Sequence, residues 1–288
     1  MQYYSFENGC KFKDKDNFLD INYLFLPGYK WVLKKLYYTP VRPEAIALLS
    51  LFAGIISAYY YAQGEYAPSI IGAFFILIKN YLDSLDGHLA RAKGLVSRFG
   101  RFLDSLCDAF VYLFLFLAIA INLSGTKSYL LAFTAMVCAF LQCSIYNYYV
   151  VSYKTFIYGS GANKTDERIG EDETWDNQEN LAGKLVYLMQ LLYHWIYGWQ
   201  DRIVARIDHL TLNVYKKRVG ETTETFIDKS WYADKAFLAF ISPLCFGTQI
   251  LLLVICTITN NLEGYLIFMI TGANLYTLSI IMLRTLFK

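Results

Sequence analysis

Six long apolar segments dominate this sequence and constrain its fold more than any other feature. Each is close to the ~20 residues that a helix needs to cross the ~30 Å hydrocarbon core of a bilayer. They are too long and too evenly apolar for the strands of a membrane barrel. The segments cover residues 44–62, 67–86, 102–122, 128–152, 235–259 and 264–286. The sequence therefore predicts an all-α integral membrane protein, a bundle of six transmembrane helices whose short connections make neighbouring helices antiparallel.

Composition excludes several other classes of protein. Of the 288 residues, 56% are hydrophobic and 17% are charged, whereas a soluble domain has about 25% charged residues. A disordered chain and an ordinary water-soluble enzyme are thereby excluded. The net charge of +2 provides no basic field, so no nucleic-acid partner is expected. The six cysteines lack CxxC spacing, which argues against a zinc site or a disulfide framework.

The placement of lysine and arginine predicts the orientation in the bilayer, because these residues collect in cytoplasmic loops. The first 43 residues contain seven of them, whereas the three loops on the opposite side together contain one, Lys127. We therefore expect both termini and the loop after the second segment to face the cytoplasm, at the inner (cell) membrane if the source is bacterial. The opening residues have no apolar stretch behind a basic start, so no cleaved signal peptide is expected.

Two regions lie outside the membrane segments. Residues 1–43 form an N-terminal cytoplasmic segment, in which the aromatic and lysine-rich stretch 20–41 is expected to lie on the membrane as an interfacial helix. Residues 153–234 form a cytoplasmic insertion between the membrane regions 44–152 and 235–288. The insertion begins with an acidic stretch and continues as an amphipathic helix. Two interpretations of this helix stay open: an interfacial helix, or a lid or docking surface for a substrate.

Four aspartates lie at the mouths of the second and third segments, where acidic groups are costly and mark function by default. At 100° per residue, Asp83 and Asp86 share one face of the first helix, and Asp104 and Asp108 share a face of the next. Antiparallel packing is expected to bring the four carboxylates together. Divalent cations such as Mg²⁺ or Mn²⁺ prefer oxygen ligands. Four carboxylates suit two such ions, an arrangement used for displacement at phosphorus.

Neighbouring residues extend this site. Arg91, at the edge of the same helix face, can bind a diphosphate through paired hydrogen bonds. Gly87, Ala90 and Gly100 remove side-chain bulk and leave space for a flat base and a ribose. The chemistry indicated is phosphoryl or phosphatidyl transfer at the membrane surface. In the alternative, the acids only cap helix ends and pair with nearby basic residues, but that role does not require four acids on converging faces.

These residues resemble the signature of the CDP-alcohol phosphotransferases, also called CDP-alcohol phosphatidyltransferases. The pattern Asp83-x2-Asp86-Gly87-x2-Ala90-Arg91-x8-Gly100-x3-Asp104-x3-Asp108 matches all eight fixed residues over 26 positions. The resemblance implies a membrane enzyme that cleaves the diphosphate of a CDP-linked alcohol. Such an enzyme transfers the phospho-alcohol to a hydroxyl acceptor and releases CMP. The resemblance also implies a homodimer.

The resemblance further implies roles for individual residues. Asp83, Asp86, Asp104 and Asp108 would be metal ligands, and Asp104 and Asp108 would be catalytic. Asp108 would be the general base for the acceptor hydroxyl. Because a metal-bound carboxylate is a weak base, the metal can instead activate the hydroxyl while Asp108 relays its proton. The implied CDP contacts are Asp83, Gly87, Ala90, Arg91, Ser97 and Gly100, with Ser97 directed at the cytosine.

The chain departs from this family in two places. Many members begin the first span with Pro-Asn-x-x-Thr, whereas this chain has Pro43-Glu44-Ala45-Ile46-Ala47. The chain therefore lacks the amide and the hydroxyl that the resemblance would assign to nucleotide contacts. The second departure is the insertion at 153–234, where family members usually have a short connection.

The donor and the acceptor allow two enzyme interpretations. In the first, CDP-diacylglycerol donates a phosphatidyl group to a small polar alcohol such as inositol phosphate, glycerol phosphate or serine. In the second, CDP-choline or CDP-ethanolamine donates to diacylglycerol or ceramide. The segment SRFGRFLDSLCD at 97–108 is closer to the first class, which we favour. A non-catalytic scaffold or transporter is a third class, but the acidic charges cluster at one membrane face instead of tracing a route across it.

Three lysines are candidate contacts for an anionic acceptor. Lys79 lies one turn before Asp83 on the same helix face, and Lys154 and Lys235 lie at the ends of the fourth and fifth segments. In the alternative, which we favour, Lys79 pairs with Asp83 or extends its ammonium toward the interface.

Overall fold

A computed structural model describes residues 4–13, 16, 18–20, 28–159, 175, 180–220 and 229–287, and all regular structure among them is helical. Each predicted apolar segment corresponds to one helix or to a broken pair. The single helices are α3 (Pro43–Tyr61), α4 (Tyr66–Ala92), α5 (Arg98–Leu123) and α6 (Thr126–Tyr158). The broken pairs are α9 (Lys235–Ile241) with α10 (Phe246–Ile258), and α11 (Leu262–Ile270) with α12 (Gly272–Phe287). The all-α prediction is thereby confirmed.

The predicted count of six spans is met only in part. Among the described residues, four stretches are long and apolar enough to cross a membrane: α3, α5, α6 and the combined α11–α12. The bent pair formed by 229–244 and α10 adds a fifth. Helix α4 has 27 residues, but Lys79, Asn80 and Asp83 interrupt its apolar run. The polar motif thus lowers the hydropathy of the helix that carries it.

The fifth segment was expected to be one continuous helix and is instead broken at its centre. A short 3₁₀ helix, η4 (Ser242–Leu244), follows α9, and Cys245 is extended before α10 begins. Pro243 accounts for the break, because proline lacks the N–H for an i to i−4 bond and its ring clashes with the preceding turn. The two halves meet at an angle of 40°.

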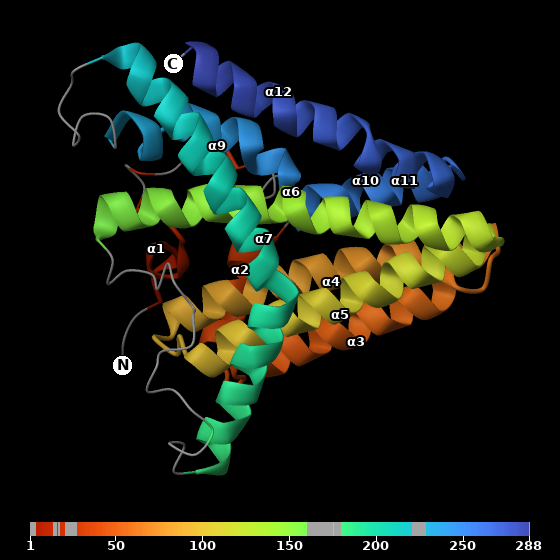
Figure 1. Cartoon of the computed structure of the whole chain (residues 1–288). Helices are drawn as coiled ribbons and strands as arrows, with labels where there is room; N and C mark the ends of the chain where they lie inside the picture. The colour runs from red at the N-terminus through yellow and green to blue at the C-terminus, as the bar shows by residue number, and fades with distance from the viewer. Residues whose placement is uncertain are drawn as a thin grey trace.

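Helices α3, α4, α5 and α6 run side by side, and α10 packs against α4 (Figure 1). Small residues allow the closest approaches. A Cβ atom added to Gly54 of α3 would lie 2.4 Å from a methyl group of Val111 on α5. The Ser57 hydroxyl donates to the carbonyl of Gly72 across the α3–α4 contact at 2.8 Å. Such small-residue contacts and interhelical hydrogen bonds are typical of membrane bundles. We call the end of the bundle where α4 ends and α5 begins the motif end.

The insertion contains one long helix, α7 (Leu181–Val219), which crosses α5 and α6 and then reaches α12 (Figure 1). The amphipathic helix that the sequence predicts is therefore present. The acidic stretch before it, at 165–180, lies almost entirely outside the described residues.

A buried polar cluster fastens the C-terminal half of α7. Asp208, 2% exposed, accepts hydrogen bonds from the Tyr148 hydroxyl at 3.0 Å, the Trp231 indole at 2.8 Å and the Tyr232 hydroxyl at 2.9 Å. Beside it, Arg284 of α12 donates to the backbone carbonyl of Trp231. The Arg284 guanidinium also lies against three aromatic rings, with the Trp231 ring centroid at 3.8 Å. Helix α7, residues 229–234 and α12 are thus joined.

The N-terminal part packs on the motif end. Helix α2 (Tyr29–Tyr37) buries Tyr29 and Leu33 against Leu85 and Leu89 of α4 and leaves Trp31 exposed. A helix is thus present within 20–41, of which residues 21–27 lie outside the described part, and its predicted position on the membrane surface stays a prediction. A short helix, α1 (Phe6–Gly9), also contacts α4.

Candidate active site

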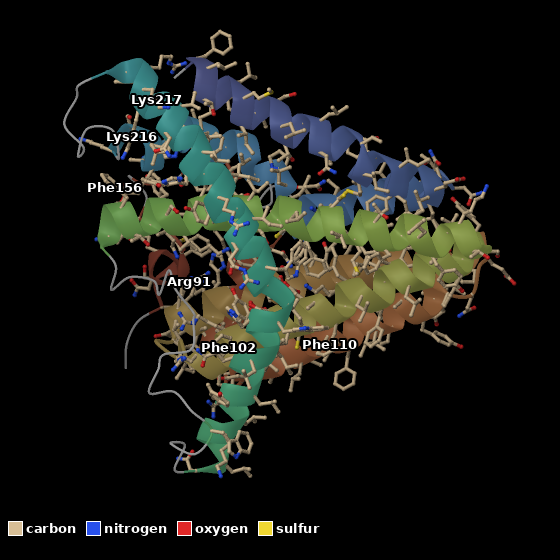
Figure 2. The ribbon with its side chains drawn as sticks, in the orientation of Figure 1. Arg91, Phe102, Phe110, Phe156, Lys216 and Lys217 are labelled. Carbon is tan, nitrogen blue, oxygen red and sulfur yellow. The ribbon has the colours of Figure 1, made fainter. Side chains whose placement is uncertain are left out.

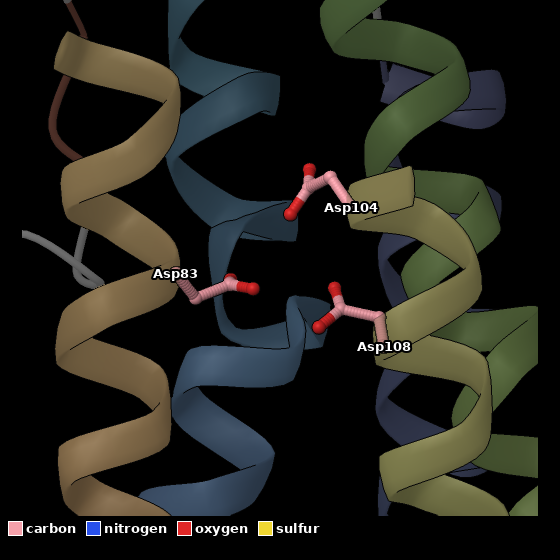
Figure 3. Close-up of side chains that lie close together, drawn as sticks. All are labelled: Asp83, Asp104 and Asp108. Carbon is pink, nitrogen blue, oxygen red and sulfur yellow. The ribbon is translucent and has the colours of Figure 1, made fainter. Parts of the chain in front are cut away.

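Three of the four predicted aspartates form a compact cluster. Asp83 projects from α4 toward Asp104 and Asp108, which project from α5 (Figure 3). One carboxylate oxygen from each lies within 4.8 Å of the other two. Asp104 and Asp108 are one turn apart on α5, and the antiparallel packing of α4 and α5 places Asp83 opposite them. This juxtaposition agrees with the helical spacing in the sequence.

Lys79 lies behind this cluster. Its side chain is 1% exposed, and its ammonium donates to Asp83 at 2.9 Å and also to Asp108. Two carboxylates and one ammonium leave a net negative charge in a largely dehydrated region. Lys79 therefore offsets part of the repulsion within the cluster. This is the pairing that we favoured from the sequence, extended to a second aspartate.

Asp86 is separate from the other three carboxylates. It is 5% exposed, and its Oδ2 has no hydrogen-bond partner among the described residues. A buried carboxylate oxygen without a donor is costly, so the position favours a cation or a donor supplied from outside the chain. The expected four-carboxylate cluster is therefore a group of three with a fourth acid beside it.

All four aspartates line one cavity of about 1120 Å³. Its walls come from α4, α5, α6 and α7, from the start of α10 and from the N-terminal segment. On the α4 wall, Gly87 and Arg91 line the cavity together with Asp83 and Asp86. A Cβ atom added to Gly87 would lie 3.4 Å from the Arg91 guanidinium. Gly87 thus lies next to that guanidinium, at a distance where a Cβ atom would be in ordinary van der Waals contact.

Arg91 has partners in this structure. Its Nε donates to the Gly9 carbonyl at 2.7 Å, and its Nη2 lies 3.2 Å from Nδ1 of His88. Figure 2 shows Arg91 at the motif end, beside the start of the chain. His88 is buried and packs on Tyr29.

Several other predicted site residues do not line the cavity. Among them, Ala90, Ser97 and Gly100 lie near the α4–α5 connection. The Ser97 hydroxyl caps α5 by accepting from the Gly100 backbone N–H at 3.0 Å. Glu44, at the start of α3, is close to Gly100 and pairs with Arg42 at 3.3 Å.

The three candidate lysines for the acceptor are not part of the cavity lining either. Lys79 is occupied by the aspartates, as described above. Lys154 lies over the ring of Phe12, with its Nζ 5.8 Å from the ring centroid. Lys235 is half-exposed at the start of α9.

The basic groups that do line the cavity include three that were not singled out from the sequence. Arg202 and Arg206 are one turn apart on α7, and Lys11 belongs to the N-terminal segment. The four-residue spacing of the two arginines was the only signal in the sequence, and it does not tell which way that face of α7 points. Helix α7 thus contributes one wall of the cavity, and both interpretations of the insertion stay predictions.

Buried polar contacts keep α7 against the bundle at this point. The Tyr197 hydroxyl donates to the Ser105 carbonyl on α5 at 2.9 Å. The Ser144 hydroxyl of α6 donates to the Gln200 side chain at 2.6 Å, and Gln200 is 1% exposed. Helix α7 is therefore a fixed wall of the cavity along this part of its length.

The donor set suits a divalent cation. One oxygen from each of three carboxylates lies within 4.8 Å of the others, and Asp86 presents a buried oxygen with no donor in the part of the chain that the structure describes. Oxygen-only sites of this kind fit Mg²⁺ or Mn²⁺ better than softer metals. The cavity thus combines acidic groups that can hold cations with basic groups that can hold anions.

Such an acidic site, set into a bundle of apolar helices, is compatible with metal-assisted displacement at phosphorus. Residues 41–212 match the CDP-alcohol phosphatidyltransferase family. The chain belongs to this family, as its signature indicated.

Named relatives are similar to parts of the chain. An archaetidylinositol phosphate synthase of Pyrococcus horikoshii is 35% identical over 69 residues, which are 24% of this chain and 35% of that protein. A phosphatidylinositol phosphate synthase of Cutibacterium acnes is 37% identical over 111 residues, 38% of this chain and 52% of that protein. A bifunctional IPC transferase and DIPP synthase of Aquifex aeolicus is 30% identical over 88 residues, 31% of this chain and 20% of that protein. The chain thus spans about a third to a half of the length of the first two relatives.

Proposed function

We propose that the protein is a CDP-alcohol phosphatidyltransferase of phospholipid synthesis that uses CDP-diacylglycerol and a small polar alcohol. The alcohol is of the inositol phosphate, glycerol phosphate or serine type. The observation that carries this proposal is the convergence of Asp83, Asp104 and Asp108 beside Arg91 in one cavity. In the reaction, the acceptor oxygen bonds to the lipid-linked phosphorus, the bond from that phosphorus to the bridging oxygen breaks, and CMP leaves.

The residues of the α4 wall would hold the donor. Arg91 can bind the diphosphate through its planar guanidinium, and Gly87 lines the cavity next to that guanidinium. Gly100 and Ser97 would act at a distance from the cavity by fixing the start of α5. The two aspartates of α5 then have defined positions relative to α4.

The acidic cluster would bind one or two divalent ions, Mg²⁺ or Mn²⁺, through Asp83, Asp86, Asp104 and Asp108. Such ions supply neutralisation of the diphosphate and stabilisation of the charge that develops on the leaving group. Asp108 would accept the proton of the acceptor hydroxyl, directly or as a relay. Lys79 holds Asp83 and Asp108 in place from behind.

Two observations support a phosphorylated acceptor. Two of the relatives are named as an archaetidylinositol phosphate synthase and a phosphatidylinositol phosphate synthase. In addition, Arg202 and Arg206 line the cavity on α7, on a different element from Arg91. Two separate basic groups suit two separate anions, the donor diphosphate and an acceptor phosphate.

The membrane arrangement is part of the proposal. We infer six spans, with α4 as the span that carries the motif and α9–η4–α10 as a broken span. With the motif end at the cytoplasmic face, the donor would enter from the inner leaflet and the polar acceptor from the cytoplasm. The proline break and the charged motif then lie in helices that border the cavity, where irregular or charged segments are tolerated.

The direct test is CMP release by the purified protein in detergent with Mg²⁺. CDP-diacylglycerol and CDP-ethanolamine would each be offered with inositol phosphate, glycerol phosphate, serine, diacylglycerol and ceramide. We expect release with CDP-diacylglycerol and one phosphorylated alcohol, and none when EDTA replaces Mg²⁺. Turnover only with CDP-ethanolamine and a lipid alcohol would refute the proposed substrates. CDP binding without turnover in any pair would refute catalysis on these acceptors.

A further inference from the structure

The N-terminal segment crosses the motif end between α4 and α6. We call its described part, residues 4–13, 16 and 18–20, the strap. On the α4 side, the Gly9 carbonyl accepts a hydrogen bond from Arg91 at 2.7 Å, and Phe6 packs on His88. The strap thus begins on the helix that carries the first half of the motif.

On the α6 side, three tyrosines hold the strap. The Tyr153 hydroxyl donates to the Asp16 carbonyl at 3.1 Å, and the Tyr158 hydroxyl donates to the Asp16 carboxylate at 2.9 Å. The Tyr146 hydroxyl donates to the Asp20 carboxylate at 2.6 Å. The Phe12 side chain is buried in the same cluster. The strap therefore spans from α4 to α6, and both helices contribute residues to the cavity wall.

The approach of the strap to α4 is close. A Cβ atom added to Gly9 would lie 3.0 Å from the His88 carbonyl and 3.4 Å from Cβ of Ala92. Only a residue without a side chain reaches this position without displacement, and Gly9 is buried there. Glycine permits a close approach of this kind. The contact fixes the position of the following residues relative to the cavity.

Lys11 follows two residues later and faces the cavity. It lines the cavity together with Arg91 and the three clustered aspartates, and its side chain is exposed. The next lysine, Lys13, does not line the cavity. Its ammonium lies near the Tyr158 ring at 5.6 Å from the centroid. The strap therefore directs one cation into the site and another away from it.

We propose that the strap closes the mouth of the active site over the CDP-linked donor and that Lys11 binds the donor diphosphate beside Arg91. This inference rests on the proposed function and adds a residue outside the family motif. A diphosphate carries more charge than one guanidinium neutralises, and an ammonium on a flexible stem suits a second contact. The position of Lys11 next to the Gly9–Arg91 contact favours the donor over the acceptor, for which the α7 arginines are available.

The first test compares CDP binding by the full-length wild type and three variants, by calorimetry in detergent with Mg²⁺. Lys11→Ala is expected to weaken CDP binding about tenfold, which corresponds to about 1.4 kcal/mol. Lys11→Arg should retain most of the affinity, and the matched control Lys13→Ala should bind as the wild type does. In turnover, Lys11→Ala should raise the KM for the donor while kcat at saturating donor changes less than threefold.

The outcomes separate this inference from the proposed function. A wild type that does not bind CDP would overturn both. A wild type that binds CDP, with Lys11→Ala equal to Lys13→Ala, would overturn the role of Lys11 and leave the proposed function standing. A change confined to the Mg²⁺ requirement, with unchanged CDP affinity, would make Lys11 only a counter-charge for the aspartates and would likewise overturn the inference.

A second test addresses closure of the strap. Cys10 lies within it and is partly exposed, whereas Cys256 is a partly exposed thiol on α10, far from the cavity lining. We expect CDP with Mg²⁺ to slow maleimide labelling of Cys10 at least threefold and to leave Cys256 unaffected, as followed by mass spectrometry of the intact, full-length protein. Equal slowing at both thiols, or none at Cys10, would show that the strap does not close over the donor.

Discussion

Each aspartate in the cluster has a distinct environment, and these differences lead to different expectations on substitution. Asp108 contacts Lys79 and faces both Asp83 and Asp104. Asp86 lines the same cavity but is 5% exposed and outside the compact cluster, with one oxygen lacking a partner among the described residues. The proposed proton acceptor, Asp108, and the separate carboxylate, Asp86, are therefore distinguishable by position.

Asp108→Asn tests catalysis most directly. The amide keeps the shape of the side chain but removes a negative metal ligand and the proposed proton acceptor, so CMP release should fall at least about 100-fold. The measurement is the initial rate with saturating donor and acceptor. Gel filtration and the melting temperature serve as controls for folding. A variant that keeps more than a tenth of the wild-type rate would contradict the role of Asp108.

Lys79→Met tests whether the buried ammonium supports the cluster. Without it, Asp83 and Asp108 repel each other in a dehydrated region, and removal of one partner of a buried ion pair costs about 3–5 kcal/mol. We expect a lower melting temperature in EDTA and a smaller deficit in Mg²⁺, because bound cations stabilise the folded state. The exposed control Lys127→Met should melt as the wild type does. A deficit that is the same with and without Mg²⁺ would argue against shared charge compensation.

At the scale of the element, α7 is the longest of the described helices. It is a helix of 39 residues that serves as a cavity wall and is fastened at Tyr197, Gln200 and Asp208. These contacts lie between residues 197 and 208 of α7. Loss of any one of them should therefore weaken the packing of this cavity wall.

Asp208→Ala is expected to loosen that wall. The buried Trp231 indole and the partly buried hydroxyls of Tyr148 and Tyr232 would lose their acceptor. An unpaired buried donor such as the indole costs about 1–3 kcal/mol. The melting temperature should fall clearly, and CMP release should fall with it. The adjacent exposed residue provides the control, His209→Ala. Equal melting temperatures for the two variants would show that the cluster does not hold α7.

The predictability of these elements from sequence differs for physical reasons. The Asp83, Asp104 and Asp108 juxtaposition follows from helical spacing, because 100° per residue fixes which side chains share a face. Asp86 is rotated about 60° from Asp83 by the same rule, which accounts for its separate position. Pro243 is itself a local signal for a break in the helix. The uniformly apolar character of residues 235–259 led instead to the prediction of one continuous span.

Other parts of the site could not be read from periodicity. The apolar pattern of α7 predicts an amphipathic helix, but its direction across the bundle depends on distant partners such as Ser144 and Trp231. Lys11 lies in a segment with no helical repeat. Its position depends on the Gly9–Arg91 contact, which joins residues 82 positions apart in the chain.

At the scale of the whole molecule, the number and direction of the spans decide which compartment the cavity serves. The structure has helices for all six predicted segments, but α4 and the broken α9–α10 pair are the two that deviate from a simple apolar span. Both border the cavity, whereas the break between α11 and α12 lies outside its lining.

Single-cysteine labelling in intact cells checks this arrangement. In a cysteine-free background, Lys127→Cys and Thr259→Cys should react with an impermeant maleimide, because six spans place both loops outside. Leu95→Cys, between α4 and α5, should react only after permeabilisation. If Thr259→Cys is protected until the membrane is opened, the α9–α10 pair enters and leaves on one side, and five spans or fewer remain.

The enclosed guanidinium of Arg284 has a practical consequence for handling the protein. It lies on the last helix, yet it supports Trp231, and Trp231 supports Asp208 on the cavity wall. Deletion of residues 284–287 would remove this cation from among the three aromatic rings that surround it. Loss of this part of α12 would therefore weaken the packing of the cavity wall at Asp208.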